Sequence, residues 1–593
     1  MTSTTVQDRP VSDRRPDRTG RRWTGRRWAR RLRSEPVLAP LGALALAVLM
    51  TWPAAIRPAS TVPANTLDPL LVAWALGWVG YALVNQPLDF WQSNIFWPEP
   101  DSFALTESFL GYAPLSLVGD GPTAALVRYN VMYIVVAALA FGGAYALARQ
   151  LGARWPGALV AGLAFAYCPW RIAQADHLHV LSTGGIALSL AALARGHGYT
   201  LQHGWRPETA RPRWAVAGWL VACWQLTIGF GIGIPFGYVL GLLGVAAAAG
   251  WLLALAPWRE RRALPWSLVP AHGAGAAAFG FTAWFMSRPY LNVADRNDVA
   301  RRTVDQVEAH SPTLRGLITA PEHSWLWGDL HAGWRDGLPS TEMTVLPGFA
   351  LIGLAAAGLF VSAWSLRRRL VMLAASVVVV LLSLGTNFSG RFNYLWLYEN
   401  LTGWDALRTS GRLVIYLSLL LALLAAGFVT WLTERFQSLR PLPVRLPIRV
   451  RWTVAAVLPA LLVFAEGIDT TPHPRPTPAP VVLKQYEAPV MVLPISLPFD
   501  RTVEWWSTDG YPKMVNGASG LQPPITGHLK TKAQQFPDAE SVAYLRKYKV
   551  RTVVVLKDHI AGTKYAGVLI RPSDGLPLTR TETPEAVIFV LDR

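Results

Sequence analysis

Long apolar runs separated by short polar segments occupy most of the chain before residue 467. A helix needs about 20 mostly apolar residues to cross the hydrocarbon core of a bilayer. Eleven runs are candidates for such helices: 38–57, 124–148, 156–173, 177–194, 214–230, 232–256, 265–287, 345–365, 370–385, 411–433 and 450–466. The pattern therefore predicts a polytopic α-helical membrane protein with about 11 transmembrane helices.

Basic residues gather in alternate connections between these runs. If the amino terminus lies inside, the inside segments are 1–35, 149–155, 195–213, 257–264, 366–369 and 434–451. They hold 28 of the 55 Lys and Arg residues but only seven of the 37 Asp and Glu residues, which gives a net charge of +21 inside and −3 elsewhere. Because cytoplasmic loops of membrane proteins are enriched in Lys and Arg, we expect a multi-pass protein of the cell membrane. Its amino terminus would be cytoplasmic and its carboxyl terminus extracytoplasmic.

The composition agrees with this class of protein. Hydrophobic residues make up 52% of the 593 residues and charged residues only 16%, against about 25% charged in a typical soluble domain. A net charge of +18 can indicate a nucleic-acid partner. Here the positive charge lies in the predicted cytoplasmic segments, so membrane topology explains it instead. We therefore expect membrane lipids and no nucleic acid as partners. The two cysteines, Cys168 and Cys223, are too few for a disulfide framework or a cysteine zinc site.

Two further apolar stretches, 67–84 and 104–119, are interpreted as parts of one large outer loop, 53–123. If both crossed the membrane, the segment between them would be cytoplasmic, yet it contains acidic residues and no Lys or Arg. We expect the Trp-rich helix over 67–84 to lie at the membrane interface. Two more outer loops are predicted at 288–344 and 386–410.

The composition changes after residue 466. The Pro-rich stretch 470–480 is typical of a linker, and all eight lysines follow it. Strand-like runs at 489–495, 550–556 and 586–591, with an amphipathic helix near 538–548, predict a small extracytoplasmic α/β domain. The expected organisation is an Arg-rich, disordered cytoplasmic tail over 1–35, a transmembrane domain over 36–466 and the α/β domain over 467–593.

Six motifs resemble those of an uncharacterised bacterial family within the GT-C class of membrane glycosyltransferases. They are LDPLLVAWALGW (67–78), NIFWPEPDSFALTESFLG (94–111), FAYCPWRIAQADHLHVLST (165–183), TEMTVLPG (341–348), WDALRTSGRL (404–413) and WSTDGYPKMVNGASGLQPP (506–524). The resemblance covers nearly the whole chain after residue 35. It implies a GT-C-like fold that transfers a sugar from a polyprenyl-phosphate donor to an acceptor on the outer face of the membrane.

In such enzymes an acidic residue of the first outer loop is the catalytic base, and the resemblance carries this role onto Asp68. Two interpretations of Asp68 remain open. It can cap an apolar helix, because Asp followed by Pro is a typical helix start. It can also deprotonate an acceptor hydroxyl, and desolvation would then raise its pKa. Many GT-C enzymes have two acids side by side or one residue apart, whereas Pro69 and Leu70 follow Asp68 here.

Glu107 is the second candidate catalytic residue, because it precedes an apolar run in which a charge needs a partner. Asp68 and Glu107, together with waters, could bind a hard divalent cation such as Mg or Mn. Whether a metal is required stays open at this point.

Arg171, Asp176, His177 and His179 cluster in a short outer turn. One interpretation is a solvated hairpin with an Arg171–Asp176 ion pair. The other assigns Arg171 to the donor phosphate, and Asp176 and His177 to sugar hydroxyls. Two histidines spaced by two residues do not share a helix face, so a zinc site is not expected.

Arg408 and Arg412 flank a Thr-Ser-Gly turn at the outer end of the tenth predicted span. Arginine suits bidentate phosphate contacts, so both are predicted to bind the donor phosphate; the alternative is a membrane-interface anchor. Glu342 is interpreted as a helix cap or as a partner for an outer arginine.

Aromatic and polar side chains of the outer segments are candidate sugar or acceptor contacts, because aromatic rings can stack on apolar sugar faces. His310 and Trp325 belong to the loop 288–344, and Trp505 and Trp506 to the C-terminal domain. The alternatives are interface anchoring for Trp325 and burial in a small core for Trp505 and Trp506.

Two functions are consistent with these observations. The first is an inverting membrane glycosyltransferase with a polyprenyl-phosphate-linked sugar donor and a glycan, lipid or protein acceptor in the cell envelope. The alternative is a non-enzymatic lipid or glycolipid transporter or envelope-assembly protein. The lack of internal duplication in the sequence counts against a repeat-built transporter.

Overall fold

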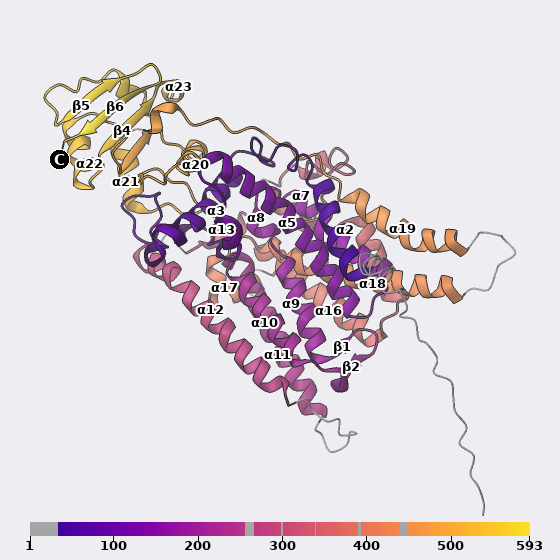
Figure 1. Cartoon of the computed structure of the whole chain (residues 1–593). Helices are drawn as coiled ribbons and strands as arrows, with labels where there is room; N and C mark the ends of the chain where they lie inside the picture. Colours follow the sequence, from indigo (N-terminus) through magenta and orange to yellow (C-terminus); the bar gives the residue numbers. More distant parts are fainter. Residues whose placement is uncertain are drawn as a thin grey trace, which may run out of the picture.

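The computed structural model describes residues 34–254, 266–297, 301–338, 340–389, 393–438, 448–484 and 486–592. The predicted tail over 1–33 lies outside these ranges, so its disorder stays a prediction. Helices pack side by side through most of the molecule, and a small sheet lies at one end (Figure 1).

Each of the eleven predicted apolar runs contains helix. The main helices are α2 (Glu35–Met50), α5 (Gly121–Gln150), α6 (Trp155–Tyr167), α9 (Gly184–His197), α10 (Pro212–Leu226), α11 (Phe230–Ala254), α12 (Leu268–Arg296), α15 (Phe349–Phe360), α16 (Leu366–Ser383), α18 (Val414–Ser438) and α19 (Ile448–Glu466). Several of them have proline at their first or second position, where its fixed φ and missing N–H suit the first helical turn; Pro122, Pro156 and Pro212 are examples.

Within the described residues, four helical stretches are both long and apolar enough to cross a membrane: Gly121–Gln150, Leu178–His197, Phe230–Leu253 and Ser410–Gln437. They support the assignment of the chain as a membrane protein. Crossing by the remaining predicted segments, and the orientation of the termini, stay predictions.

The helical core is built around two long helices. α5 packs against α2, α6 and α9, and α18 packs against α6, α15 and α16. α10 lies between α9 and α12. Small residues allow close approach at these contacts, as where Gly157 of α6 meets the backbone of Ala426 in α18.

The sheet near the carboxyl terminus has the strand order β3-β4-β6-β5, formed by Val490–Leu493, Thr552–Leu556, Ala586–Leu591 and Leu578–Glu582. β3 and β4 are parallel and the other pairs are antiparallel. Parallel neighbours need a long crossover, which here contains the helices α20 (Leu497–Trp506), α21 (Pro524–Lys532) and α22 (Ala539–Lys547). The three predicted strands and the predicted helix are therefore present, and β5 is additional.

The first outer loop contains α3 (Asp68–Asn85), the helix predicted over 67–84. The stretch 104–119 forms only short turns and the four-residue α4 (Ala113–Ser116), too short to cross a membrane. The sequence had predicted that α3 lies at an interface with one face open, but most of its residues are buried. Its Trp74 and Trp78 are buried, because α3 packs between α5, α4 and α20.

Hydrogen bonds join α3 to distant parts of the chain. Trp74 Nε1 donates to Asn94 Oδ1 over 2.9 Å, and the Asn94 amide donates to Ser507 Oγ over 3.0 Å and to the Pro512 carbonyl oxygen over 3.1 Å. α3 thus connects the first outer loop to the C-terminal segment.

Gly80 of α3 tests how closely this helix is packed. A Cβ on Gly80 would lie 1.9 Å from the backbone oxygen of Ser116, so Gly80→Ala forces α3 and α4 apart. We expect a loss of about 1–3 kcal/mol in stability, measured as a lower thermal midpoint of the detergent-purified protein. Gly42→Ala in α2 is the control, because nothing lies within 4 Å of its Cβ position. Equal midpoints for the two variants would contradict this packing.

Candidate functional site

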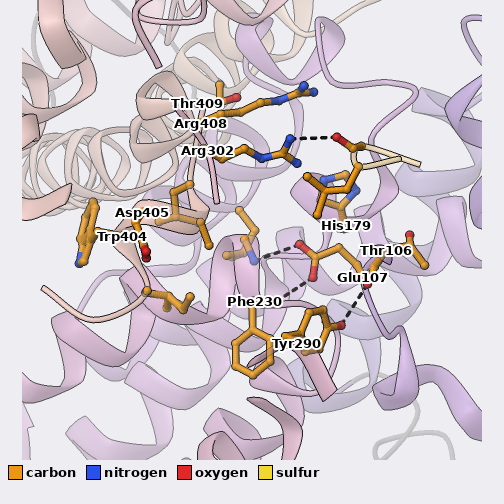
Figure 2. Close-up of a pocket in the computed structure, with 18 of the residues that line it drawn as sticks. Thr106, Glu107, His179, Phe230, Tyr290, Arg302, Trp404, Asp405, Arg408 and Thr409 are labelled. Carbon is orange, nitrogen blue, oxygen red and sulfur yellow. Dashed lines mark hydrogen bonds between the residues drawn. The ribbon is translucent and has the colours of Figure 1, made fainter. Parts of the chain in front are cut away.

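A cavity of about 1170 Å³ lies where the first outer loop, the helical core and the C-terminal segment meet. Its walls include the start of α3, the loop 104–109, the start of α11, part of α12, the segment 394–416 and the segment 497–521. Figure 2 shows part of this wall, with the side chains of Glu107, His179, Arg302 and Arg408 around it. The cavity therefore gathers charged residues that are far apart in sequence.

Asp68 lines the cavity as the first residue of α3. Its Oδ1 lies 3.2 Å from Arg501 Nη2, and its Oδ2 lies 3.3 Å from His177 Nε2. The N-cap position is Leu67, and no side-chain hydrogen bond caps the helix. The helix-cap interpretation of Asp68 is therefore wrong, because its carboxylate faces two side chains at the cavity wall.

The electrostatics of Asp68 differ from the expectation of a raised pKa. Burial does raise it, but the hydrogen bond with His177 and the charge of Arg501 outweigh burial and hold the pKa of Asp68 well below its ordinary value. For His177, burial lowers the pKa, and the hydrogen bonds to Asp176 and Asp68 outweigh it and raise the pKa to about 10. At neutral pH the pair is thus a carboxylate beside an imidazolium.

Asp176 holds His177 from the side opposite to Asp68. Asp176 Oδ1 lies 2.9 Å from His177 Nδ1, and Asn65 Nδ2 donates to Asp176 Oδ2 over 2.7 Å. His177 lines the cavity and Asp176 does not. Asp176 is therefore placed to orient His177, and the structure does not support its predicted contact with a sugar.

Both interpretations of Arg171 are wrong. The side chain is buried and donates from Nη1 to Thr183 Oγ1 over 3.1 Å and from Nη2 to the Leu181 oxygen over 2.7 Å. Within the described residues it forms no ion pair with Asp176 and does not line the cavity. Arg171 closes the turn from inside and is not placed to bind a donor phosphate.

Arg412 lines the cavity and forms an ion pair with Glu342. Its Nε lies 3.4 Å from Glu342 Oε2, and its Nη1 lies 3.3 Å from His179 Nε2. Burial opposes the charge of Glu342, but Arg412 and His177 outweigh it and lower the pKa of Glu342 to about 2. The interpretation of Glu342 as the partner of an outer arginine is confirmed.

Arg408 and Arg302 add positive charge to the cavity. Unlike Arg412, neither forms an ion pair with a described carboxylate. Arg302 Nη1 donates to the backbone oxygen of Gly520 over 2.9 Å. Burial and the charges of Arg408 and Arg412 lower the pKa of Arg302 to about 10. Arg408 makes no hydrogen bond or ion pair with any other part of the chain that the structure describes, and its side chain extends beside that of Arg302 (Figure 2). Guanidiniums that repel one another in a cavity form a site for an anion.

Glu107 also lines the cavity, but its carboxylate is already bound. Oε2 accepts from the Phe230 N–H over 2.8 Å and Oε1 from the Gly231 N–H over 3.0 Å, as Figure 2 shows. Burial raises the pKa of Glu107 despite these bonds. The two N–H groups belong to the first turn of α11, so Glu107 caps this helix and is not a free second carboxylate.

These contacts test the expected divalent cation. The oxygens of Asp68 face a guanidinium and an imidazolium, and those of Glu107 accept backbone N–H groups. Among the described residues, no group of three or more His, Cys, Asp and Glu is placed to hold a metal ion. The donor set therefore does not fit Mg or Mn.

The other four predicted sugar or acceptor contacts, His310, Trp325, Trp505 and Trp506, do not line the cavity. Trp505 and Trp506 are buried, and their Nε1 atoms donate to the Pro122 oxygen over 2.8 Å and the Thr477 oxygen over 2.9 Å. His310 Nδ1 lies 2.7 Å from the Gln306 oxygen on its own loop, and Trp325 is exposed at the surface. Trp505 and Trp506 thus anchor α20, as the burial alternative expected.

Arg302 and Arg501, two arginines that line the cavity, were not predicted from the sequence. Arg302 belongs to a loop with several other charged residues, and nothing in the adjacent sequence sets it apart from them. Arg501 lies between Asp500 and Glu504 on a helix that ends in two tryptophans. Charged residues among apolar ones are the signal that could have identified Arg501, because buried charges need partners.

No protein-family model and no curated protein matches the chain. Among solved structures it is similar to the arabinofuranosyltransferase AftD from Mycobacteria, with a TM-score of 0.51 and 14% identity over 93% of this chain and 41% of AftD. It is also similar to the oligosaccharyltransferase AglB from Archaeoglobus fulgidus, with a TM-score of 0.43 and 14% identity over 90% of this chain and 70% of AglB. For ArnT from Cupriavidus metallidurans the TM-score is 0.39 and the identity 12%, over 93% of this chain and 97% of ArnT. The likeness to AftD, which extends over nearly all of this chain, shows a GT-C-like fold, as the sequence motifs indicated.

Proposed function

We propose that the protein is an integral membrane glycosyltransferase that transfers a sugar from a polyprenyl-phosphate donor to a cell-envelope acceptor on the outer face of the membrane. One observation carries the proposal. A single large cavity holds an ionised carboxylate, Asp68, together with a group of arginines, Arg302, Arg408 and Arg412. The likeness to AftD, an arabinofuranosyltransferase, supports sugar transfer in this fold.

The chemistry follows from this arrangement. Asp68 accepts the proton of an acceptor hydroxyl while the hydroxyl oxygen attacks the anomeric carbon. The bond from that carbon to the phosphate oxygen breaks, the lipid phosphate leaves with the electron pair, and the configuration inverts. Arg408 and Arg302 stabilise the leaving phosphate, which needs no general acid because it is a stable anion.

A low pKa does not prevent Asp68 from acting as the base. The acceptor hydroxyl becomes strongly acidic only as its oxygen bonds to carbon, so a weak base in the right position is sufficient. His177 and Arg501 keep the carboxylate ionised and fix its direction. No step of this mechanism passes through a metal, since the donor set does not fit one.

Replacement of the base is the direct test. Asp68→Asn keeps the shape but cannot accept the proton, so we expect the transfer rate to fall by about 100-fold or more. Purified protein would be incubated with a panel of polyprenyl-phosphate sugars and envelope acceptors, with Asp89→Asn, an exposed acid of the same loop, as the control. Undiminished transfer by Asp68→Asn would exclude Asp68 as the base. Lipid movement in vesicles without consumption of any donor would support the transporter alternative.

Removal of the unpartnered guanidinium tests the phosphate site. Arg408→Gln removes a charge that contacts the phosphate, so we expect the KM for the lipid donor to rise by about 10-fold to 100-fold. Arg315→Gln, an exposed arginine outside the cavity, serves as the control and should leave the KM unchanged. An unchanged KM in Arg408→Gln would contradict the assignment.

The raised pKa of His177 predicts an alkaline loss of stability. Protonated His177 stabilises the folded protein through Asp68 and Asp176. This contribution to stability is complete below the ordinary pKa of 6.5 and disappears as the pH rises through about 10. We expect the thermal midpoint of the wild-type protein to fall across this range, and the midpoint of His177→Gln to be lower at pH 7 and to lack this part of the fall. His203→Gln, at an exposed position, should behave as wild type. Parallel pH curves for His177→Gln and wild type would show that His177 is not charged.

A further inference from the structure

Three buried charged residues occur together on α20, at Asp500, Arg501 and Glu504. Asp500 has its own partner, because Lys530 Nζ donates to its Oδ2 over 2.8 Å. Arg501 and Glu504 are not joined by such a hydrogen bond, because Arg501 Nη1 lies 3.8 Å from Glu504 Oε2. Arg501 instead extends from the C-terminal segment to Asp68 in the first outer loop, with 3.2 Å between Nη2 and Oδ1.

Arg501 is nearly enclosed, whereas the carboxylate that it contacts is open to the cavity. The side chain of Arg501 is 6% exposed and that of Asp68 is 33% exposed. Arg501 therefore contacts Asp68 from a mostly enclosed position, and the exposed part of the carboxylate is left for an acceptor. A guanidinium held in this way fixes the direction of a carboxylate oxygen.

Glu504 lies on the far side of Arg501. Its Oε1 accepts a hydrogen bond from the Ala518 N–H, and its Oε2 is 3.8 Å from Arg501 Nη1, without a hydrogen-bond partner among the described residues. Burial raises the pKa of Glu504 to about 8, although the charge of Arg501 opposes this rise. Asp68 is thus the closer partner of Arg501, at 3.2 Å against 3.8 Å for Glu504.

Several contacts fix α20 relative to Asp68. α20 packs against α3, and Trp505 and Trp506 donate to the backbone at Pro122 and Thr477. The position of Arg501 is therefore fixed by a helix whose carboxyl end is hydrogen-bonded to the rest of the protein.

We propose that Arg501 is a positioning residue for Asp68, so that the C-terminal segment completes the active site of the helical core. This inference rests on the proposed function, because it assigns a role in the same sugar transfer. In this role Arg501 acts through Asp68: it contacts Oδ1, while Oδ2 lies beside His177.

Other charged groups also act on Asp68, and the test must separate them from Arg501. They are Asp176 and His177 just before α8 (Leu178–Leu181), His179 within α8, and Arg408 and Arg412 before and at the start of the Ser410–Gln437 stretch. These groups remain when Arg501 alone is replaced.

The experiment is the pH profile of kcat/KM for full-length wild type, Arg501→Gln and Arg501→Lys in one transfer assay. Without the Arg501 charge the pKa of Asp68 rises, so the acid limb of Arg501→Gln should move up by about one pH unit or more. Arg501→Lys keeps the charge and should restore most of the wild-type limb. Lys530→Gln is the matched control, because it breaks the other buried ion pair of α20 without touching Asp68. It should lower the thermal midpoint and leave the acid limb in place.

An acid limb of Arg501→Gln that coincides with that of wild type would overturn the inference, and so would an equal shift in Lys530→Gln. No transfer by wild type with any donor would contradict the proposed function instead. A double-mutant cycle of thermal midpoints tests the contact without activity. We expect the losses of Asp68→Asn and Arg501→Gln to be less than additive in the double variant, and additive losses would also overturn the inference.

Discussion

The contact of one carboxylate with two cationic side chains joins the three parts of this molecule. Asp68 comes from the first outer loop, His177 from a turn of the helical core and Arg501 from the C-terminal segment. A partly buried carboxylate is stable only when such partners satisfy it. The burial of α3 and the anchoring of α20 by its tryptophans both bring these partners into place.

The sequence predicted elements well where a single physical rule decides them. Long apolar runs predicted the positions of the helices, and alternating runs predicted β3, β4 and β6, because each pattern reports the burial of one element. Arg408 and Arg412 were identified because charges at the ends of apolar helices need partners, and Asp68 was identified through the resemblance to the GT-C class. All three line the cavity.

The failures have a common physical cause, which is that partners distant in sequence cannot be read from local pattern. Arg171 is the exception: it looked like a surface cation, yet it bonds a backbone oxygen inside its own turn, a contact that residue type does not reveal. Glu107 looked like a second acid, yet the start of α11, more than one hundred residues later, supplies its hydrogen bonds. Trp74 looked interfacial, yet Asn94 and the C-terminal segment enclose it. Arg501 was missed for the same reason, since its partner precedes it by several hundred residues.

The shared cavity also constrains how the chain is threaded through the membrane. Asp68, His177, Arg302, Arg408 and Arg501 all line it, so a cavity that opens on one face of the bilayer, as proposed, requires all five at that face. Any two of them must then be separated by an even number of crossings. The predicted runs give two crossings between Asp68 and His177, four from there to Arg302, two to Arg408 and two to Arg501. Under the proposed function, the even numbers of crossings that the site needs are thus the numbers that the arginine distribution predicts, although one argument uses side-chain contacts and the other only loop charge.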